Sequence, residues 1–242
     1  MKGLILAGGT GSRLKPLTDV TNKHLLPIYG KPMIYYPLET LKSAGIKEIM
    51  IVTGKYHAGE VFALMGSGKE FGVKFTYKIQ DEAGGIPQAI SLAEDFVGND
   101  KFVAINGDNI LFESIAPFAK EFENGKELSR VLLYKGTIEQ AKKSGVAMLK
   151  DNDVLQVIEK PKEPKSTWVV IGVYIYSSDV FSVIKQLKPS ARGELEISDV
   201  HNHYISKKAL KASKLTKAWY DAGTVDELLE ANNAVKSWKN TE

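Results

Sequence analysis

Cysteine is absent from the 242 residues of this chain. Its absence excludes disulfide bridges, thiolate metal sites and a cysteine nucleophile. Long apolar runs are missing as well: the longest, residues 169–175, includes Gly172 and is far too short to cross a bilayer. Only a few apolar residues precede Gly8 and Gly9, which does not fit a signal peptide. We therefore expect a cytoplasmic protein that makes no use of a membrane.

An excess of charge of either sign is also lacking. The 32 basic and 29 acidic residues leave a formal charge of +3. This balance is too even for a nucleic-acid-binding surface, so no nucleic acid is expected as a partner. Any anionic ligand must be held by local geometry. Hydrophobic residues make up 43% of the chain, which is an ordinary content for a folded globular protein.

Strand-like and helix-like apolar segments alternate along the first half of the chain. The expected strands are 2–7, 46–53, 73–80 and 102–106, and the expected helices are 33–44, 61–65 and 86–97. Such alternation requires crossover connections, and it predicts an α/β protein with a mostly parallel sheet. The second half predicts strands at 131–134, 154–158 and 169–176, and helices at 180–187, 197–204 and 225–238. No linker or repeat divides the chain, so we expect one domain.

A glycine-rich loop, residues 8–13, follows the first expected strand. It lies where open α/β sheets bind ligands, and glycines let backbone N–H groups approach phosphate oxygens. Leu14 stands where a dinucleotide fingerprint needs its third glycine, and Ser12 where a Walker loop needs lysine. The pattern that remains is Gly-Gly-x-Gly-x-Arg with Lys23 ten residues beyond Arg13. These two cations could grip a polyphosphate, or the segment could be a tight turn with two solvated side chains.

Two other patterns favour structural explanations. Residues 66–69 (Gly-Ser-Gly-Lys) lack the first glycine of a Walker loop and predict a plain turn between a helix and a strand. His201 and His203 are two residues apart in an expected helix, so they point to different sides and cannot share a metal ion. We expect both histidines at the surface.

Nine short motifs occur in collinear order along nearly the whole chain. They are 6–14 (Leu-Ala-Gly-Gly-Thr-Gly-Ser-Arg-Leu), 22–27 (Asn-Lys-His-Leu-Leu-Pro), 31–34 (Lys-Pro-Met-Ile), Gln80 with Gly84 and Gly85, 107–109 (Gly-Asp-Asn), 159–161 (Glu-Lys-Pro), 188–190 (Lys-Pro-Ser), 192–196 (Arg-Gly-Glu-Leu-Glu) and 219–224 (Trp-Tyr-Asp-Ala-Gly-Thr). With these motifs the chain resembles the sugar-1-phosphate nucleotidyltransferase family, and within it most closely the glucose-1-phosphate thymidylyltransferases.

The resemblance implies a fold and a reaction. The fold is a single-domain, Rossmann-like three-layer sandwich on a mostly parallel mixed sheet, with a nucleotide-binding region (about 1–110), a sugar-phosphate-binding region (about 111–225) and a terminal helix (225–238). The reaction is Mg²⁺-dependent transfer of a thymidylyl group from dTTP to glucose 1-phosphate, which releases pyrophosphate. One alternative is a uridylyltransferase that uses UTP. Another is a nucleotide-sugar-binding regulator without catalysis.

The resemblance also implies roles for individual residues. The catalytic set is Arg13, Lys23, Asp108, Lys160 and Asp221, with Asp108 and Asp221 as the Mg²⁺ ligands. The nucleotide-binding set is Leu6, Ala7, Gly8, Gly9, Thr10, Gly11, Ser12, Arg13, Lys23, Gln80, Gly85 and Asp108. The sugar-phosphate-binding set is Asn109, Gly145, Glu159, Lys160, Val170, Gly172 and Arg192. Taken alone, Gln80 could equally be a strand-end amide bonded to the adjacent loop.

Two departures from the family pattern affect these expectations. Ser144 stands before Gly145, at a position where the family often has an aromatic residue. The resemblance therefore predicts the type of reaction more closely than it predicts which sugar 1-phosphate is used. The sequence also ends soon after the expected helix 225–238, as in the short members of the family. We therefore expect no feedback site of the kind that the longer members carry on C-terminal helices. A homo-oligomer is compatible with the resemblance.

Overall fold

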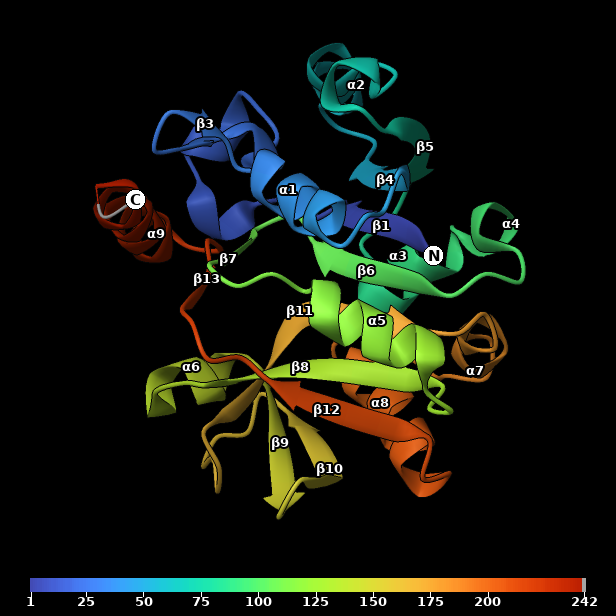
Figure 1. The fold of residues 1–242 in the computed structure, drawn as a ribbon. Coiled ribbons are helices and arrows are strands. Elements are labelled where there is room, and N and C mark those ends of the chain that lie inside the picture. The colour runs from blue at the N-terminus through green and yellow to red at the C-terminus, as the bar shows by residue number, and fades with distance from the viewer. Residues whose placement is uncertain (241–242) are drawn as a thin grey trace.

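A mixed β-sheet forms the centre of the molecule in the computed structural model, which describes residues 1–240. Its N-terminal half is parallel: β1 (Lys2–Ala7) lies between β4 (Glu48–Gly54) and β6 (Phe102–Asn106), and β5 (Lys74–Gln80) pairs with β4. The carboxyl ends of these strands therefore meet at one edge, where the glycine-rich loop leaves β1 (Figure 1). This edge carries the site described below.

The C-terminal half of the sheet is mostly antiparallel. β11 (Trp168–Tyr176) pairs with β6, with β8 (Ser129–Lys135) and with β9 (Gly145–Lys150). β10 (Asp153–Glu159) continues the sheet beyond β9, and β12 (Leu210–Lys214) lies parallel to β8. The pairing of β11 with β8 is interrupted between Val170 and Tyr174. At this interruption the Gly172 N–H is free of the ladder and donates to a side chain of the site.

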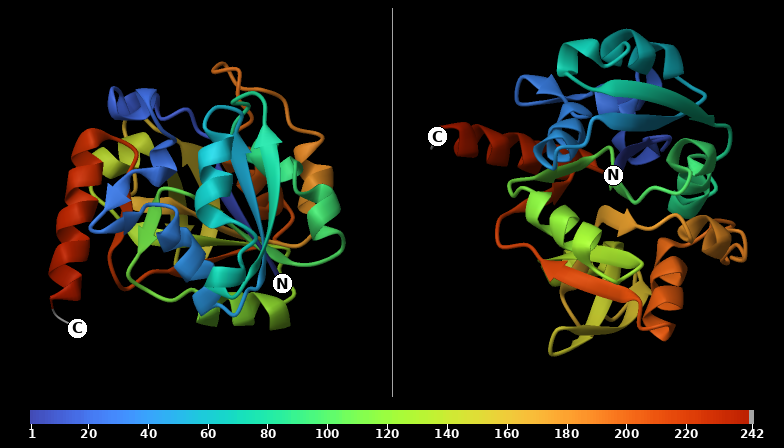
Figure 2. Two further views of the ribbon diagram at one scale, coloured as in Figure 1. Left: turned by 90° about the horizontal axis from the view of Figure 1, so that it is seen from above. Right: turned by 45° about the vertical axis from the view of Figure 1, so that its right-hand side comes forward.

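Helices cover both faces of the sheet, which gives three layers (Figure 2). One face packs against α1 (Tyr35–Ser43), α2 (Ala58–Met65), α5 (Ala116–Asn124) and α6 (Ile138–Lys143). The other packs against α3 (Ile86–Ser91), α4 (Glu94–Val97), α7 (Val180–Ile184) and α8 (Ile197–Ser206). Along β1, Leu4 and Leu6 face one helical layer while Ile5 and Ala7 face the other, as the two-residue period of a strand requires. This burial on both faces explains why β1 is apolar throughout.

A third, smaller core holds the last helix against the N-terminal segment of the chain. α9 (Val225–Lys239) follows β13 (Trp219–Asp221), which pairs with β7 (Asn109–Leu111). The hairpin of β2 (Pro27–Ile28) and β3 (Lys31–Pro32) lies next to α9. Buried side chains from the N-terminal loop, this hairpin, β7 and α9 fill the space between them; they include Leu14, Ile28, Ile110, Ala222 and Ala231. The C-terminal helix is thereby fixed beside the glycine-rich loop.

Most expected elements are confirmed within one to four residues, and the α/β fold on a mixed sheet is confirmed as well. The expected helix 86–97 is interrupted, because α3 ends at Ser91, whose hydroxyl donates back to the Gln88 carbonyl. Residues 66–69 do form a turn between α2 and β5, with a short 3₁₀ helix (Lys69–Phe71). The sequence did not predict α5, α6, β7, β9, β12 or β13.

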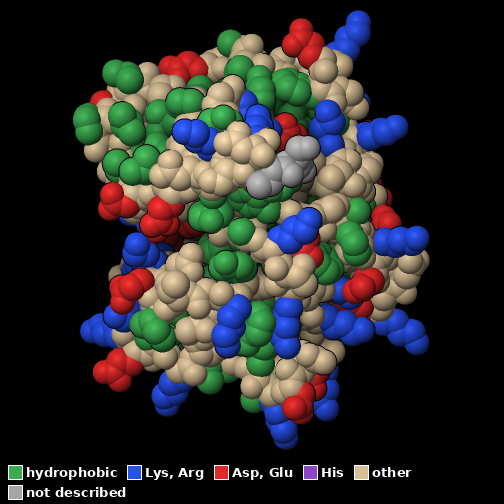
Figure 3. Space-filling view, turned by 60° about the vertical axis from the view of Figure 1, so that its left-hand side comes forward, with side chains coloured by type: hydrophobic (Ala, Val, Ile, Leu, Met, Phe, Trp, Pro, Cys, Tyr) green, Lys and Arg blue, Asp and Glu red, His purple; other side chains and the backbone are tan. Residues whose placement is uncertain are grey.

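Charged side chains of both signs lie on the face of the molecule drawn in Figure 3. On the face in Figure 3, acidic and basic side chains are interspersed and form no large patch of one sign. This agrees with the nearly balanced formal charge of +3. Among the described residues, no helix combines the length and the apolar character that crossing a membrane requires.

Candidate active site

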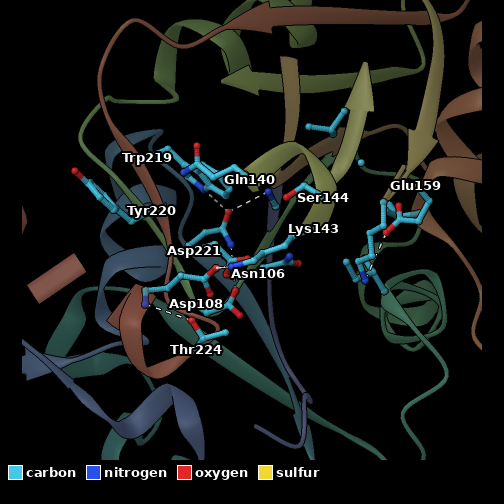
Figure 4. A pocket seen from close by; sticks show the side chains of 18 of the residues that line it. Asn106, Asp108, Gln140, Lys143, Ser144, Glu159, Trp219, Tyr220, Asp221 and Thr224 are labelled. Atoms are coloured by element: carbon cyan, nitrogen blue, oxygen red, sulfur yellow. Dashed lines mark hydrogen bonds and ion pairs between the residues drawn. The ribbon is translucent and has the colours of Figure 1, made fainter. Parts of the chain in front are cut away.

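A cavity of about 560 Å³ opens at the carboxyl ends of the parallel strands (Figure 4). Its walls come from β6 and β7, from β9 to β11, from α6 and from the segment that joins β13 to α9. The lining residues that carry the argument below are Arg13, Asp108, Lys143, Glu159, Asp221 and Glu227. Segments from the start, the middle and the end of the chain thus meet at one site.

Asp108 and Asp221 lie next to each other although they are far apart in the sequence. The pairing of β7 with β13 places Asp221 opposite Asn109, and the Ala222 N–H donates to the Asp108 carbonyl at 3.0 Å. The Lys23 ammonium donates to Asp108 Oδ2 at 2.5 Å, and this pair is largely shielded from solvent. The structure therefore brings together the two expected metal ligands and one of the two expected phosphate-binding cations.

The pKa values of the two carboxyl groups are shifted in opposite directions. Burial alone would raise the pKa of Asp108, but the Lys23 ammonium beside it holds that pKa well below the usual range. Burial and the neighbouring Asp108 carboxylate raise the pKa of Asp221 to about 8. Asp221 Oδ1 is buried and has no hydrogen-bond partner among the described residues. Two close carboxylates, one with an unpartnered buried oxygen, are a donor set that fits a Mg²⁺ ion.

The protein does not supply a complete metal cage. In residues 1–240, no group of three or more histidine, aspartate or glutamate side chains is arranged to hold an ion. Mg²⁺ is commonly bound by one or two carboxylates, with phosphate oxygens and water as the other ligands. The pair Asp108 and Asp221 thus matches an ion that arrives together with a phosphate substrate.

The glycine-rich loop passes between Lys23 and Gln80. A Cβ atom placed on Gly8 would lie 2.1 Å from Gln80 Oε1, and one placed on Gly9 would lie 3.6 Å from the Lys23 side chain. A side chain at position 8 would therefore displace Gln80. Gln80 is buried at the end of β5 and donates a hydrogen bond to Gln88. The Gln80 amide thus bonds to a residue of α3 and lies in close contact with the backbone of Gly8.

Arg13 and Gly85 also lie at this edge of the sheet. Arg13 Nη2 would be 2.9 Å from a Cβ atom on Gly223, two residues after Asp221. The guanidinium therefore lies beside the metal-binding segment. Gly85 begins α3 with φ of +94°, and its neighbour Gly84 accepts a hydrogen bond from the Leu195 N–H. The structure thus places all of the expected nucleotide-binding residues along the strand ends around the loop.

The expected sugar-phosphate residues converge from three neighbouring strands. Gly145 of β9 is paired both with Val170 of β11 and with Glu159 of β10. Burial raises the pKa of Glu159, and the nearby Lys160 and Arg192 oppose this rise. Arg192 Nη2 lies 3.7 Å from Glu159 Oε1 and is also bound by Glu196. Of these residues, Gly145, Glu159, Lys160 and Val170 line the cavity, whereas Arg192 reaches it only through its contact with Glu159.

Asn109 differs from the other expected sugar-phosphate-binding residues, because its side chain is hydrogen-bonded within the protein. It is buried, and its Oδ1 accepts hydrogen bonds from Trp219 Nε1 at 2.7 Å and from the Gly172 N–H at 3.0 Å. Its Nδ2 donates to Asp108 at 3.1 Å. The side chain is thus occupied by protein groups, and it fixes β7, β13 and the interruption of β11 relative to one another.

The expectation that His201 lies at the surface is wrong. His201 is fully buried, and its Nε2 lies 2.9 Å from the Tyr176 hydroxyl. It belongs to the inward face of α8, since it follows Ile197 by four residues and lies next to Val200, both of which are buried. Burial lowers the pKa of His201 to about 3, so the ring is neutral. The four-residue spacing from Ile197 to His201 was the signal in the sequence that could have predicted a buried His201.

Other cavity residues were not anticipated at all. Thr224 caps α9, and its hydroxyl accepts a hydrogen bond from the Glu227 N–H. Lys143, at the end of α6, forms an ion pair with Glu227. Thr224 ends the motif 219–224, but no local motif includes Lys143 or Glu227, because their proximity to the site depends on how α6 and α9 pack.

Comparison with known proteins agrees with this geometry. The model of the nucleotidyl transferase family matches residues 2–237. A glucose-1-phosphate thymidylyltransferase of Neisseria meningitidis is 40% identical over 99% of this chain and 84% of its own length. A Bacillus anthracis protein that is provisionally assigned the same activity, crystallised with sucrose, has a TM-score of 0.92 and 53% identity over 97% of this chain and 94% of its own. A UDP-glucose pyrophosphorylase bound to UDP-glucose has a TM-score of 0.83 and 27% identity, with 98% of both chains covered.

Proposed function

The chain belongs to the nucleotidyl transferase family, and we infer that it transfers a thymidylyl group from dTTP to glucose 1-phosphate, giving dTDP-glucose and pyrophosphate. The observation that carries this proposal is the pair Asp108 and Asp221, which lines one cavity together with Arg13, while Lys23 binds Asp108. The 40% identity to the Neisseria enzyme over nearly the whole chain supports the choice of substrates. In this proposal residues 1–110 bind the nucleotide and residues 111–225 bind the sugar phosphate.

The reaction is a direct displacement at phosphorus. A phosphate oxygen of glucose 1-phosphate attacks the α-phosphorus of dTTP, and the bond from that phosphorus to the oxygen that bridges to the β-phosphate breaks. Pyrophosphate leaves with the electron pair of that bond. The nucleophile belongs to the substrate, so no activated serine or cysteine is needed. The protein has to align two anions that repel each other and to stabilise the charge that develops.

The basic residues divide this work between them. Arg13, which lies beside Gly223, would hold the β- and γ-phosphates through its planar fork of donors. Lys23 lies between the glycine loop and Asp108, which suits contact with the α-phosphate. Lys160 and Arg192 flank Glu159 and would hold the 1-phosphate, while Glu159 accepts hydrogen bonds from sugar hydroxyls. Arg13 and Lys23 then bind the nucleotide, and Lys160 and Arg192 bind the sugar phosphate.

Asp108 and Asp221 would hold the Mg²⁺ ion. When bound, the ion neutralises charge on the triphosphate and on the reacting phosphoryl group. The unpartnered Oδ1 of Asp221 and the raised pKa of that residue are the features of the chain that support this assignment. Without an ion, burial and the charge of the Asp108 carboxylate disfavour ionisation of Asp221.

Uridylyl transfer is the second candidate. The structural similarity to a UDP-glucose pyrophosphorylase favours it. Thymine and uracil differ by one methyl group, a difference that typically discriminates by about 1–3 kcal/mol. Gln80 and Gly85 are the proposed base-binding residues, and both would serve either base. We therefore expect dTTP to be the better substrate and UTP to be used more slowly.

A pyrophosphate-release assay tests the proposal. The protein is incubated with Mg²⁺, with glucose 1-phosphate, and with dTTP, UTP, ATP, CTP or GTP in turn. The highest kcat/KM is expected with dTTP. A higher value with UTP would make the protein a uridylyltransferase. Measurable nucleotide binding without release from any of the five would favour a regulator. Replacing glucose 1-phosphate by other hexose 1-phosphates tests the effect of Ser144.

A further inference from the structure

One ion pair crosses the mouth of the cavity. Lys143 is the last residue of α6, and its Nζ lies 3.1 Å from Glu227 Oε1 in the first turn of α9. Both residues line the cavity, and Figure 4 shows Lys143 extending into it. More than half of the Lys143 side chain remains exposed to solvent, compared with 23% of that of Glu227. An exposed ion pair of this kind contributes little to stability, so its partners can exchange at low cost.

Cations are scarce in the cavity. Among its described lining residues, seven are acidic and three are basic. The acidic ones are Asp108, Glu139, Glu159, Asp221, Asp226, Glu227 and Glu230, and the basic ones are Arg13, Lys143 and Lys160. Both substrates are polyanions, so each basic side chain that can reach them strengthens their binding. Arg13 and Lys160 already have proposed ligands, whereas Lys143 pairs with the Glu227 carboxylate, which a phosphate could replace.

The position of Glu227 indicates which phosphate Lys143 can reach. A Cβ atom on Gly223 would lie 3.4 Å from Glu227 Oε2 and 2.9 Å from Arg13 Nη2. Glu227 therefore lies between Lys143 on one side and the Arg13 guanidinium on the other. Its Oε2 is buried and forms no hydrogen bond with any described residue. A phosphate group bound by Arg13 would occupy the neighbourhood into which the Lys143 ammonium already points.

We propose that Lys143 is a further substrate-binding residue, which exchanges Glu227 for an oxygen of the pyrophosphate portion of the nucleotide when the substrate binds. The proposal rests on the function inferred above. Lys143 and Arg13 then hold the leaving group from two sides of the cavity, one from α6 and one from the glycine loop. Glu227 keeps the ammonium in the cavity while no substrate is bound.

Substitution of Lys143 by methionine tests this proposal, because it keeps the length of the side chain and removes its charge. Lys142→Met is the matched control: Lys142 is the preceding residue on the same helix, pairs with Glu139 at 2.9 Å and does not line the cavity. The readouts are the KM for pyrophosphate in the reverse reaction, the KM for glucose 1-phosphate in the forward reaction, and calorimetric binding of pyrophosphate with Mg²⁺.

Lys143→Met is expected to raise the KM and the Kd for pyrophosphate about tenfold, as loss of a charge-assisted hydrogen bond does. The KM of Lys143→Met for glucose 1-phosphate should stay within about twofold of wild type. In the control Lys142→Met, the KM for pyrophosphate and the KM for glucose 1-phosphate should both stay within that range. Lys143→Arg should restore most of the affinity. Glu227→Gln should leave the KM for pyrophosphate unchanged or lower it, because it releases Lys143.

Three results would overturn the proposal. Lys143→Met could behave like Lys142→Met, it could raise only the KM for glucose 1-phosphate, or Glu227→Gln could raise the KM for pyrophosphate as much as Lys143→Met does. The last result would make the ion pair purely structural. Failure of the proposed function is seen separately, as absence of dTDP-glucose formation by the wild-type protein. Calorimetry with pyrophosphate still tests Lys143 in that case.

Discussion

At the scale of single residues, the site depends on side chains whose surroundings change their chemistry. Asp108 is held ionised by Lys23, whereas Asp221, whose strand pairs with the one that follows Asp108, has a raised pKa. Arg13 is placed by the backbone at Gly223, and any side chain at that glycine would meet the guanidinium. Individual atoms, rather than the overall charge of the chain, therefore determine what this cavity binds.

Arg13→Lys tests the importance of guanidinium geometry. The substitution keeps the positive charge but removes the planar fork that binds two phosphate oxygens at once. We expect kcat to fall by about 10²–10³, a loss typical of preorganised groups that stabilise transition-state charge. Steady-state kinetics with dTTP and glucose 1-phosphate measure it. A variant with wild-type kcat would show that Arg13 acts only as a point charge.

His201 gives a prediction for stability against pH. Burial lowers its pKa from the ordinary value of 6.5 to about 3 in the folded protein, so the unfolded chain binds a proton in this interval that the folded chain does not. Stability therefore decreases as pH falls below 6.5, by up to about 1.4 kcal/mol per pH unit for this residue. His24, lowered in the same way, adds a similar contribution.

His201→Gln should therefore reduce the pH dependence of the free energy of unfolding between about pH 6.5 and 5, although it lowers stability at pH 7. Urea unfolding at several pH values measures the slope. His203→Gln is the matched control, because this neighbour on α8 is only partly buried. An unchanged slope in His201→Gln would mean that the buried histidine is charged in the folded state.

At the scale of elements, two three-residue strands assemble the metal-binding pair. β7 and β13 are too short to be predicted by periodicity, yet their pairing determines that Asp108 and Asp221 meet. The side chain of Asn109 reinforces this arrangement through hydrogen bonds with Trp219, Gly172 and Asp108. Elements that contribute little to the core can therefore decide the geometry of the site.

Asn109→Ala should destabilise the protein strongly. It leaves the Trp219 Nε1–H and the Gly172 N–H buried without an acceptor, and two unsatisfied donors together cost about 3 kcal/mol. Urea unfolding at pH 7 gives this value. Asn124→Ala, at the exposed end of α5, removes only one hydrogen bond to the Lys120 carbonyl and should change stability by less than about 0.5 kcal/mol. Equal effects of the two substitutions would contradict the role given to Asn109.

The sequence contained enough information for the framework but not for all of the site. β1 and β6 were predictable because they are short apolar runs, and the loop after β1 because its glycines are adjacent. The expectation for His201 failed because it considered only the spacing to His203 and not the spacing to Ile197. The contact between Lys143 and Glu227 could not be predicted, because it depends on how α6 and α9 pack across the cavity. No sequence pattern near either residue indicates this packing.

At the scale of the whole molecule, a nearly neutral protein contains an acid-rich cavity that has to bind two anions. Its lining residues include more than twice as many acidic as basic side chains in the described stretch of the chain, while the net charge of the protein is only +3. Long-range attraction therefore cannot be the main source of affinity. Local cations and a divalent ion have to provide it.

Removal of Mg²⁺ tests this conclusion. Without the ion, the triphosphate of dTTP would meet the acidic side chains that line the cavity, Asp108 among them, and repulsion should weaken its binding at least about tenfold. Calorimetric titration with dTTP in Mg²⁺ and in EDTA measures the difference. In Asp108→Asn the difference should shrink, because one ligand of the ion is lost. Equal affinity of the wild-type protein in both buffers would exclude the metal site at this pair.

The pairing of β13 with β7 also has a consequence for biosynthesis. Asp108 and its strand leave the ribosome long before Asp221 is translated, and α9, which completes the wall around Arg13, follows later still. A nascent or prematurely terminated chain can therefore build most of the parallel sheet and still have no functional centre. Nucleotide binding would begin abruptly, as one of the last events in the making of the molecule.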